Sequence, residues 1–445
     1  MAKRIYILGL LFILIFSGCQ DKLSKSDMEF IRDLTAAVID SSRIFPGENL
    51  PPAIAAFGPN NSGITLIRPG GRDCYPSFWI RDYAMSLESG LITKDEQLHM
   101  LLYTAERQAD STWISKSGST IPKGSIPDHI RINDGLPVYF PGTYSFENQG
   151  SEMWRLPPYG DQYFFIHMVW YYISLTGAND ILNMNVNGRN LLDRMELAFE
   201  SVPCDPETQL LIIDPDFQTC DFGFRDVITM TGKVCFGSIL RYRAAKEMAA
   251  LFRQSGQAQR VEYYENIAGK ISDMLPKTFA DERGLLLAST GVSNQADVWG
   301  TAFAVYCGAL GEPYRSGACS ALAKAYKDGV MACEGQVRHV LTCDDFSGST
   351  AWEKAAAPVN RYQNGAYWGT PVGWVCYAIY QSDPALAMQL AEEYIDHLRR
   401  TDFRINSNTH GGPYECIFPA ENYMQNPVYM TSVSIPYSAF LRLGW

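Results

Sequence analysis

The segment 76–85, PSFWIRDYAM, joins an aromatic ring to an adjacent pair of opposite charges. An Arg–Asp pair such as Arg81 and Asp82 can hydrogen-bond neighbouring hydroxyl groups of a sugar, while the Trp79 ring stacks on its apolar face. The same residues are also explained without a ligand, with Asp82 as a helix N-cap and Arg81 as its surface partner. The segment therefore predicts either sugar recognition or a capped helix start.

Two further aromatic groups stand in comparable positions. Trp299 and Trp368 lie at or just inside the beginnings of apolar helical stretches, where a single Trp is more often part of the core. In NRYQNGAYWGTP, Tyr362 and Asn364 combine a stacking surface with an amide that suits hydroxyl recognition, although a turn around Asn364 and Gly365 explains them equally well. Several such rings around one opening of the fold would favour a carbohydrate-binding cleft.

Acidic residues are concentrated in the irregular segments between the helical stretches. Glu415 follows Gly411-Gly412-Pro413, which would hold it stiffly, and it stands among Tyr and Phe residues whose burial of the carboxyl would raise its pKa. Asp161, in PPYGDQYFF, begins a helical stretch and is an N-cap, a sugar ligand or a third candidate for an acid. The remaining candidates are Asp214, Asp216, Asp221, Asp226 and Glu421.

Helical stretches of two kinds position these residues. Since no segment shows sustained alternation with a period of two, the long elements are predicted to be helices. A helix with one apolar face lies outside a fold, and a helix that is apolar all round lies inside. The one-faced stretches are 26–42, 95–111, 186–201, 257–275, 316–329 and 384–400. The stretches that are apolar nearly all round are 82–92, 161–175, 234–252, 297–310, 366–380 and 428–441.

The two kinds alternate strictly along the chain, outer then inner, six times. This pattern predicts an all-α fold, an (α/α)6 toroid of six inner and six outer helices, with residues 19–445 as a single domain. The connections from inner to outer stretches are short, whereas those from outer to inner are long, for example 202–233 and 401–427. Because this topology places all the long loops at one mouth, we expect the functional residues there.

With this layout, the chain resembles the six-hairpin glycosidases, the superfamily of glucoamylases and exo-α-1,6-mannosidases. Its FWIRD segment is similar to their W-x-R-D motif, which binds the terminal sugar in the innermost subsite. The resemblance in layout covers nearly the whole mature chain, and at motif level it is specific around Trp79 to Asp82. It implies an exo-acting glycoside hydrolase for α-linked oligosaccharides of the manno-, gluco- or rhamno-type, with an inverting mechanism.

The resemblance also implies the catalytic loops, because these families take the general acid from the loop before the sixth helix and the general base from the loop before the twelfth. Glu415 is then the base, and Asp226 is the preferred acid, with Asp221 next. The segment CDFGFRDVITMTGK looks like the Gly-Phe-Arg stretch that carries the acid in the exo-mannosidases, but Asp226 follows Arg225 directly. An adjacent Arg would lower the pKa of Asp226 unless the two side chains diverge.

Composition excludes several other classes of protein. The 445 residues carry a formal net charge of -11 and no basic stripe, so a nucleic-acid partner is not expected. The chain has only six His and neither HExxH nor CxxC spacing, which argues against a dedicated metal site. Nothing in the sequence calls for a cofactor, although a Ca²⁺ held by loop carbonyls and carboxylates would leave no trace in spacing. We expect a monomer whose partner is an oligosaccharide or polysaccharide substrate.

The N-terminus has the parts of an export signal. Lys3 and Arg4 precede an apolar run that ends at Phe16 and is too short to span a membrane, and Ser17-Gly18 precede Cys19. This arrangement resembles the lipobox of bacterial lipoproteins, with 1–18 as the signal peptide and Cys19 as the lipidated residue. It implies a protein of the bacterial cell envelope that is anchored to the lipid bilayer through Cys19.

Ten cysteines remain after Cys19, and several lie in apolar helical stretches where a buried thiol is expected. Two loop pairs, Cys204 with Cys220 and Cys333 with Cys343, are candidates for disulfide bonds in an oxidising compartment. The sequence does not fix their connectivity.

Two other classes of function remain open at this stage. A uronyl hydrolase or a polysaccharide lyase on the same toroid would need a cation for the substrate carboxylate, and Arg361, Tyr362 and His410 are candidates for such a site. A lipid-anchored glycan-binding protein would need the aromatic platforms but no opposed carboxylates. Unsaturated products would indicate a lyase, and binding without turnover would indicate a binding protein.

Overall fold

A computed structural model describes residues 22–71, 73–217, 219–221, 224–406 and 410–445. The predicted signal peptide and Cys19 lie outside the described residues. The six outer helices are α1 (Lys25–Ser42), α3 (Lys94–Ala105), α5 (Leu191–Glu200), α7 (Ala258–Phe279), α9 (Tyr314–Lys327) and α11 (Pro384–Thr401). The six inner helices are α2 (Ile80–Ser86), α4 (Asp161–Thr176), α6 (Cys235–Gln254), α8 (Val298–Cys307), α10 (Val372–Tyr380) and α12 (Thr431–Arg442).

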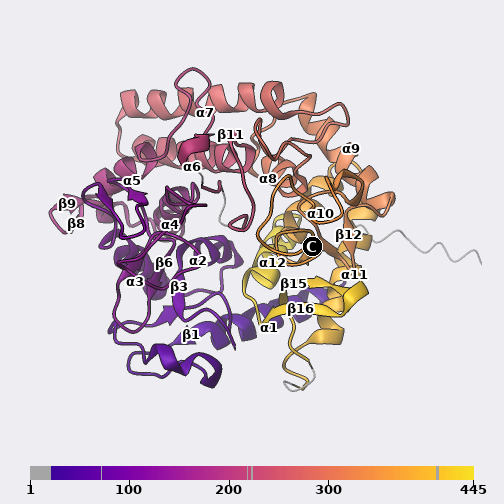
Figure 1. Cartoon of the computed structure of the whole chain (residues 1–445), viewed down its shortest axis with the longest axis horizontal. Coiled ribbons are helices and arrows are strands. Elements are labelled where there is room, and N and C mark those ends of the chain that lie inside the picture. Colours follow the sequence, from indigo (N-terminus) through magenta and orange to yellow (C-terminus); the bar gives the residue numbers. More distant parts are fainter. Residues whose placement is uncertain (1–21, 72, 218, 222–223, 407–409) are drawn as a thin grey trace, which may run out of the picture.

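The inner helices form a closed ring. Each contacts the next along the chain, from α2 through α4, α6, α8 and α10 to α12, and α12 returns to contact α2 (Figure 1). The outer helices pack against this ring, for example α7 on α6 and α11 on α10. The predicted (α/α)6 toroid is therefore confirmed, and so is the strict alternation of outer and inner helices.

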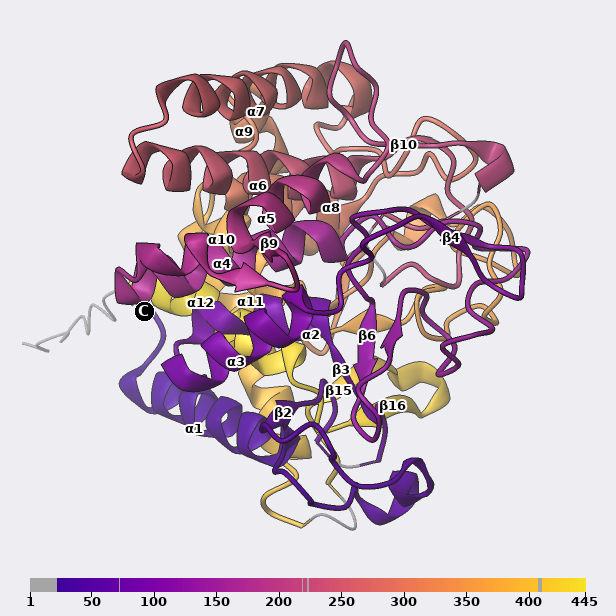
Figure 2. The ribbon, with the colours of Figure 1, turned by 90° about the vertical axis from the view of Figure 1, so that its left-hand side faces the viewer.

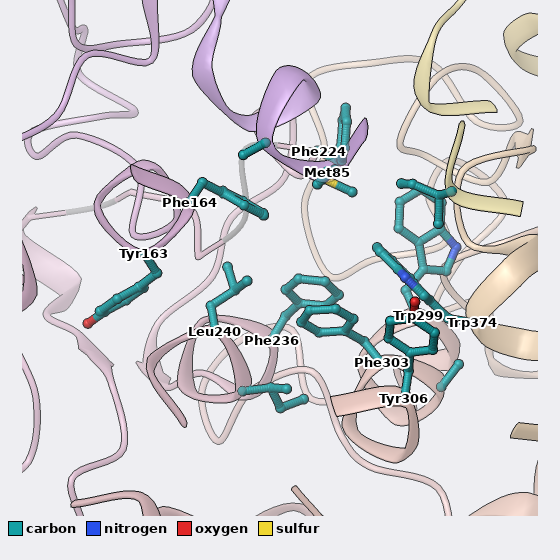
Figure 3. Packing of buried hydrophobic residues seen from close by; sticks show 14 of the residues in the cluster. Met85, Tyr163, Phe164, Phe224, Phe236, Leu240, Trp299, Phe303, Tyr306 and Trp374 are labelled. Carbon is teal, nitrogen blue, oxygen red and sulfur yellow. The ribbon is translucent and has the colours of Figure 1, made fainter. Parts of the chain in front are cut away.

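Large apolar side chains fill the space inside the ring, which is why the inner helices are apolar on every side. Phe236 of α6 and Phe303 of α8 stack with ring centroids 4.9 Å apart, and the Trp374 ring of α10 lies 4.7 Å from that of Phe303 (Figure 3). Phe164 and Met85 extend this layer from α4 and α2. The axis of the toroid is thus a packed core, and ligand space is confined to its ends.

Long loops and short strands gather at one end of the ring, as Figure 2 shows for β4, β6, β10 and β16. The strands are β1 (Arg43–Ile44), β2 (Leu66–Ile67), β3 (Ser77–Trp79), β4 (Trp113–Ile114), β5 (Thr120–Ile121), β6 (His129–Arg131), β7 (Pro137–Val138), β8 (Asn185–Val186), β9 (Arg189–Asn190), β10 (Ile212–Ile213), β11 (Gly232–Lys233), β12 (Ala332–Cys333), β13 (Gln336–Val337), β14 (Tyr367–Trp368), β15 (Tyr414–Phe418) and β16 (Tyr423–Pro427).

Two small sheets matter for the site. In one, β3 pairs with β6, so that Trp79 lies opposite His129. In the other, β12 to β16 form an antiparallel sheet in chain order, in which β14 and β16 flank β15. These sheets fix the loops that precede α2, α10 and α12, and thereby the side chains that those loops carry.

Four predicted helices differ clearly from the observed ones. The stretch 186–201 is helical only from Leu191, because β8 and β9 form a hairpin before it. The α2 helix covers Ile80–Ser86 and is followed by a 3-10 turn at Leu87–Ser89, whereas a helix over 82–92 was expected. The α3 helix ends at Ala105 rather than at 111. The stretch 366–380 is helical only from Val372, because Tyr367 and Trp368 form β14, and a buried apolar run has the same composition in a strand as in a helix.

Neither disulfide candidate is formed: Cys204, Cys333 and Cys343 are free thiols in the structure. Among the helices of the described residues, none is long and apolar enough to cross a bilayer.

Candidate active site

A pocket opens among the loops at the N-terminal ends of the inner helices. It encloses about 1010 Å³ of space, counted together with its open mouth. Its described lining comes from loops that lie far apart in the sequence and includes Tyr75, Trp79, Arg81, Asp82, Tyr144, Trp154, Phe224, Asp226, Tyr362, Glu415, Asn426 and Tyr429. Six of the predicted site residues therefore line one pocket, namely Trp79, Arg81, Asp82, Asp226, Tyr362 and Glu415.

Arg81 is the cation at the base of this pocket. Its Nη1 donates a hydrogen bond of 2.6 Å to Asp128 Oδ1 and lies 3.5 Å from Asp161 Oδ1, and its Nε lies 4.0 Å from Asp82 Oδ2. The pairing of β3 with β6 brings Asp128 beneath Arg81, and Asp161 begins α4 on the neighbouring inner helix. Arg81 and Asp82 of the FWIRD segment are thus buried in a network of ion pairs. Arg81 is therefore not an exposed partner of a helix-capping Asp82.

Asp82 has one oxygen in a defined hydrogen bond. The Tyr429 hydroxyl donates to Asp82 Oδ1 at 2.6 Å. Burial raises the pKa of Asp82 to about 6, against the opposing effects of Arg81 and the Tyr429 hydrogen bond. A carboxyl that is partly protonated near neutral pH can both donate to and accept from sugar hydroxyls.

Trp79 is held rigidly between other rings. It stacks on His129 with the centroids 4.4 Å apart and an interplanar angle of 21°, and Tyr75 approaches edge-on at 4.9 Å. His129 in turn faces Asp128, with Nδ1 2.7 Å from Asp128 Oδ2. One face of the indole is therefore covered by imidazole, and only its remaining surface contributes to the pocket.

Glu415 reaches the pocket from β15 and is 1% exposed. Its Oε2 accepts hydrogen bonds from the Tyr75 hydroxyl, at 2.6 Å, and from Asn426 Nδ2. Its Oε1 is buried and has no hydrogen-bond partner among the described residues. Burial raises the pKa of Glu415 to about 8; the hydrogen bonds from Tyr75 and Asn426 oppose this rise, and the nearby Asp82 and Asp226 add to it.

Asp226 lines the same pocket from the loop before α6. Gln363 Nε2 donates a hydrogen bond to Asp226 Oδ1, and burial raises the pKa of Asp226 to about 6, which Arg81 and the Gln363 contact oppose. The adjacent Arg225 points elsewhere, into a buried ion pair with Asp297 and to within 3.7 Å of Asp221. The two neighbouring side chains diverge, so Arg225 does not suppress protonation of Asp226.

The backbone around Glu415 is strained. Tyr75 (φ 62°), Tyr362 (φ 48°), Asn426 (φ 49°) and Val428 (φ 60°) adopt left-handed conformations although none is glycine. Such conformations cost about 1–3 kcal/mol each and persist where the surrounding structure enforces them, often at functional sites. Here they aim the Tyr75 hydroxyl and the Asn426 amide at the same carboxylate oxygen.

The remaining predicted site residues lie outside the pocket lining. Asp221 accepts from the Gly237 amide at 3.0 Å and is fully buried, and Asp161 is buried behind Arg81. Asn364 holds its own loop together, with Oδ1 accepting from Thr350 and from the Ala351 amide. The Trp299 and Trp368 rings are fully buried and lie 5.6 Å apart, which is the geometry of core residues.

The cations considered for an acidic substrate are also placed elsewhere. Arg361 donates to Glu421 at 2.7 Å and lies over the Tyr423 ring, and neither it nor His410 lines the pocket. Among the described lining residues, Arg81 is the one cationic side chain.

Sequence reasoning did not single out several residues that shape the site. Tyr75, Gln363, Asn426 and Tyr429 supply the hydrogen bonds to the carboxyl groups, and Asp128 pairs with Arg81. Of these residues only Asp128 carries a sequence signal: with His129 it forms an acid–imidazole pair in a long loop, a pair that could line the mouth of the toroid but that alone means little. The others stand in unremarkable local sequence, and only the pairing of distant strands brings them to their partners.

No protein-family model matches the chain, and no curated protein matches it by sequence. Solved structures do match. Hormoconis resinae glucoamylase superposes with a TM-score of 0.57 at 13% identity, over 93% of this chain and 73% of that chain. A GH63 mannosylglycerate hydrolase from Thermus thermophilus, in complex with glucose, gives 0.56 at 14% identity over 93% and 99% of the two chains.

A rhamnosidase from Klebsiella oxytoca with rhamnose bound gives a TM-score of 0.55 at 10% identity, over 95% of this chain and 64% of that chain. At these identities the likeness concerns the fold. The chain has the six-hairpin (α/α)6 fold of these glycosidases, as the layout of its helices predicted.

We expect Asp221 and Asp226 to respond oppositely to neutralisation. Asp221→Asn weakens the acceptor of the Gly237 amide and the second carboxyl contact of Arg225, which keeps Asp297; these losses outweigh the relief of the burial that raises the pKa of Asp221, and should lower the free energy of unfolding by about 1 kcal/mol. Asp226→Asn removes a carboxyl whose burial disfavours its charge, so at pH 8 its thermal midpoint should equal or exceed that of the wild type. Calorimetry of both variants at pH 8 checks this, and a stable Asp221→Asn protein would contradict a structural role for Asp221.

Proposed function

From this six-hairpin glycosidase fold and its pocket, we propose that the protein is an exo-acting, inverting glycoside hydrolase for α-linked neutral oligosaccharides. The manno-, gluco- and rhamno-types are the candidate substrates. The observation that carries the proposal is the meeting of two carboxyl groups, Asp226 and Glu415, in one pocket with the Trp79, Arg81 and Asp82 cluster. Glycoside hydrolysis requires such a pair flanking the scissile bond.

Glu415 is suited to the general base. Tyr75 and Asn426 both bind its Oε2 and so fix the orientation of the carboxylate, which leaves Oε1 to accept a proton from water. In an inverting reaction this water attacks the anomeric carbon from the face opposite the leaving group. The separation of the two carboxyl groups is then about 6.5–9.5 Å, which remains a prediction.

Asp226 is suited to the general acid. Burial raises its pKa to about 6, but the pKa of Glu415 is raised further, to about 8, so with one proton on the pair the free pocket holds it mainly on Glu415. The assigned roles, which follow from the two loops, require the form in which Asp226 carries the proton and donates it to the glycosidic oxygen as the bond breaks. At the end of the reaction Asp226 is ionised and Glu415 is protonated. One proton passes from Glu415 to solvent and one returns to Asp226 before the next cycle.

The innermost subsite lies on the Arg81 cluster. Asp82 offers a carboxyl to hydroxyl groups of the terminal sugar, and Trp79 adds an apolar surface. Arg81 is already paired with Asp128, and the carboxyl groups around it outnumber it, so the subsite disfavours a uronate carboxylate. This charge balance supports neutral sugars over the uronyl hydrolase or lyase alternative.

Variants of the two carboxyl groups separate their roles. Asp226→Asn should lose about 10²–10⁴-fold in kcat on an α-linked oligosaccharide, but it should retain most activity on the matching 2,4-dinitrophenyl glycoside, whose leaving group needs no proton. Glu415→Gln should lose activity on both substrates, since the attacking water still needs a base. Initial rates of monosaccharide release on a manno-, gluco- and rhamno-panel provide the measurement.

Glu421→Gln is the matched control, because Glu421 lies on the turn after β15 and pairs with Arg361 outside the pocket. It should retain wild-type rates. The opposite pattern of the two main variants would exchange their roles, and full activity of both would remove them from catalysis.

The pH dependence follows from the same pair. The pKa of Asp226 is raised to about 6 and that of Glu415 to about 8, so between these values the two carboxyl groups together carry one proton, which is the active form. Below about pH 6 both are protonated and no base is left, and above about pH 8 both are ionised and no acid is left. We expect a bell-shaped profile of kcat/KM with limbs near these values. A profile that stays flat up to pH 10 would contradict a carboxyl acid in this pocket.

A further inference from the structure

A second cavity lies at the other end of the toroid. It encloses about 640 Å³, counted with its mouth, and is lined by Trp170, Tyr242, Arg243, Lys246, Glu247 and Arg442, together with Glu88, Ala250, Tyr306 and Cys307. These residues come from the C-terminal halves of inner helices: Glu88 follows α2, Tyr306 is near the end of α8, and Arg442 ends α12. The candidate active site lies at the opposite, N-terminal ends of the same helices.

The cations of this far-end cavity are incompletely compensated. Within the described part of the chain, the carboxylate nearest to Arg243 is that of Glu247, with Oε1 3.8 Å from Arg243 Nε, and Arg243 Nη2 is buried without a hydrogen-bond partner. Arg442 makes no ion pair within 4 Å in the described part of the chain; its guanidinium lies 4.3 Å from the centre of the Tyr306 ring. Lys246, by contrast, pairs with Glu265 at 2.6 Å. Two guanidinium groups thus remain to donate hydrogen bonds to an oxyanion.

Two carboxylates, those of Glu247 and Glu88, lie beside these guanidinium groups and supply hydrogen-bond acceptors. Glu247 is 5% exposed, and its Oε1 lies 2.6 Å from His167 Nδ1, while its Oε2 is buried with no partner among the described residues. Glu88 accepts from the Tyr306 hydroxyl at 2.7 Å. A ligand that satisfies both sets must carry an anionic group for the guanidiniums and a hydroxyl that donates to Glu247.

The electrostatic environment of the two ends is opposite. In the candidate active site the pKa of Asp82, of Asp226 and of Glu415 is raised. Burial also opposes ionisation of Glu88, but His167, Arg243 and Arg442 outweigh it and hold the pKa of Glu88 below its ordinary value. The far-end cavity is thus the more cationic of the two.

We propose that the far-end cavity is a second, non-catalytic binding site for a small acidic saccharide, a sugar ring that bears a carboxylate or a phosphate group. Arg243 and Arg442 bind the oxyanion, Glu247 Oε2 accepts a sugar hydroxyl, and Trp170 and Tyr242 provide ring surface. The site is independent of the proposed hydrolase activity and selects for the charge that the candidate active site disfavours.

Titration calorimetry of the full protein tests this with four probes: glucuronate, glucose 6-phosphate, glucose and inorganic phosphate. We expect saturable binding of glucuronate or glucose 6-phosphate, at least about tenfold tighter than the binding of glucose or phosphate. Whichever of these two acidic sugars binds more tightly identifies the preferred oxyanion. Glucose bound as tightly and weakened by Arg442→Gln would overturn the role of the two guanidiniums, whereas glucose binding that Arg442→Gln leaves unchanged belongs to the candidate active site. Equal binding of phosphate would overturn the role of the sugar contacts.

Two variants and a matched control locate the binding. Arg442→Gln and Arg243→Gln should each weaken binding of the acidic sugar by about tenfold or more, and Arg442 ends α12 at the surface, so its loss leaves the fold intact even if Arg243→Gln does not fold. Arg253→Gln should bind within twofold of wild type, because Arg253 lies on the same helix but pairs with Glu265 outside the cavity.

The proposal is wrong if neither acidic sugar binds, or if binding is unchanged in Arg442→Gln and in folded Arg243→Gln. The same titrations in Glu415→Gln keep this result separate from the hydrolase proposal. The acidic sugar should bind to this variant as it binds to the wild type, because the far-end cavity is intact and turnover is not needed.

Discussion

One buried guanidinium, that of Arg81, holds the candidate active site together. It contacts Asp128, which directly precedes β6, Asp161 from α4 and Asp82 from its own helix, and it lies 5.3 Å from the Phe224 ring in the loop that carries Asp226. A buried charge of this kind is tolerated only when it is paired, so the three carboxyl groups must stay within reach of it. The positions of β3, β6, α4 and the loop before α6 are therefore coupled to one side chain.

Charge balance around Arg81 also explains the chemistry of the pocket. One cation cannot neutralise every carboxyl that faces it, so burial leaves Asp82, Asp226 and Glu415 with raised pKa values. A pair of carboxyl groups that shares protons near neutral pH is what acid–base cleavage of a glycosidic bond needs. At the other end of the inner ring the balance is reversed, with Arg243 and Arg442 beside a Glu88 whose pKa is lowered. The same six helices thus present two environments of opposite charge.

The helical architecture could be predicted from the sequence because it depends on the number of apolar faces of each helix. The short strands could not, since β14 has two residues and β15 has five, too few for an alternating pattern to emerge. For the same reason Trp368 was expected in a helix and is found in β14, where it belongs to the core.

In the candidate site too, some residues could be predicted from local sequence and others could not. Trp79, Arg81 and Asp82 are neighbours in the sequence, so their local pattern predicted their shared position. Tyr75 lies 340 residues from Glu415, and Gln363 lies 137 residues from Asp226. Contacts of that kind depend on how β15 and β16 pair and on left-handed backbone conformations at Tyr75, which a Tyr rarely adopts, and at Asn426, which an Asn adopts more readily. Only the folded chain reveals them.

The central claim is that Asp226 and Glu415 act from opposite sides of one glycosidic bond. The measurement that tests it most directly is time-resolved proton NMR of the sugar first released from an α-linked oligosaccharide, before mutarotation equilibrates the anomers. An inverting pair predicts that the β-anomer appears first and the α-anomer grows in later. Initial release of the α-anomer would contradict the inverting geometry, and the absence of any released sugar across the manno-, gluco- and rhamno-panel would contradict the hydrolase itself.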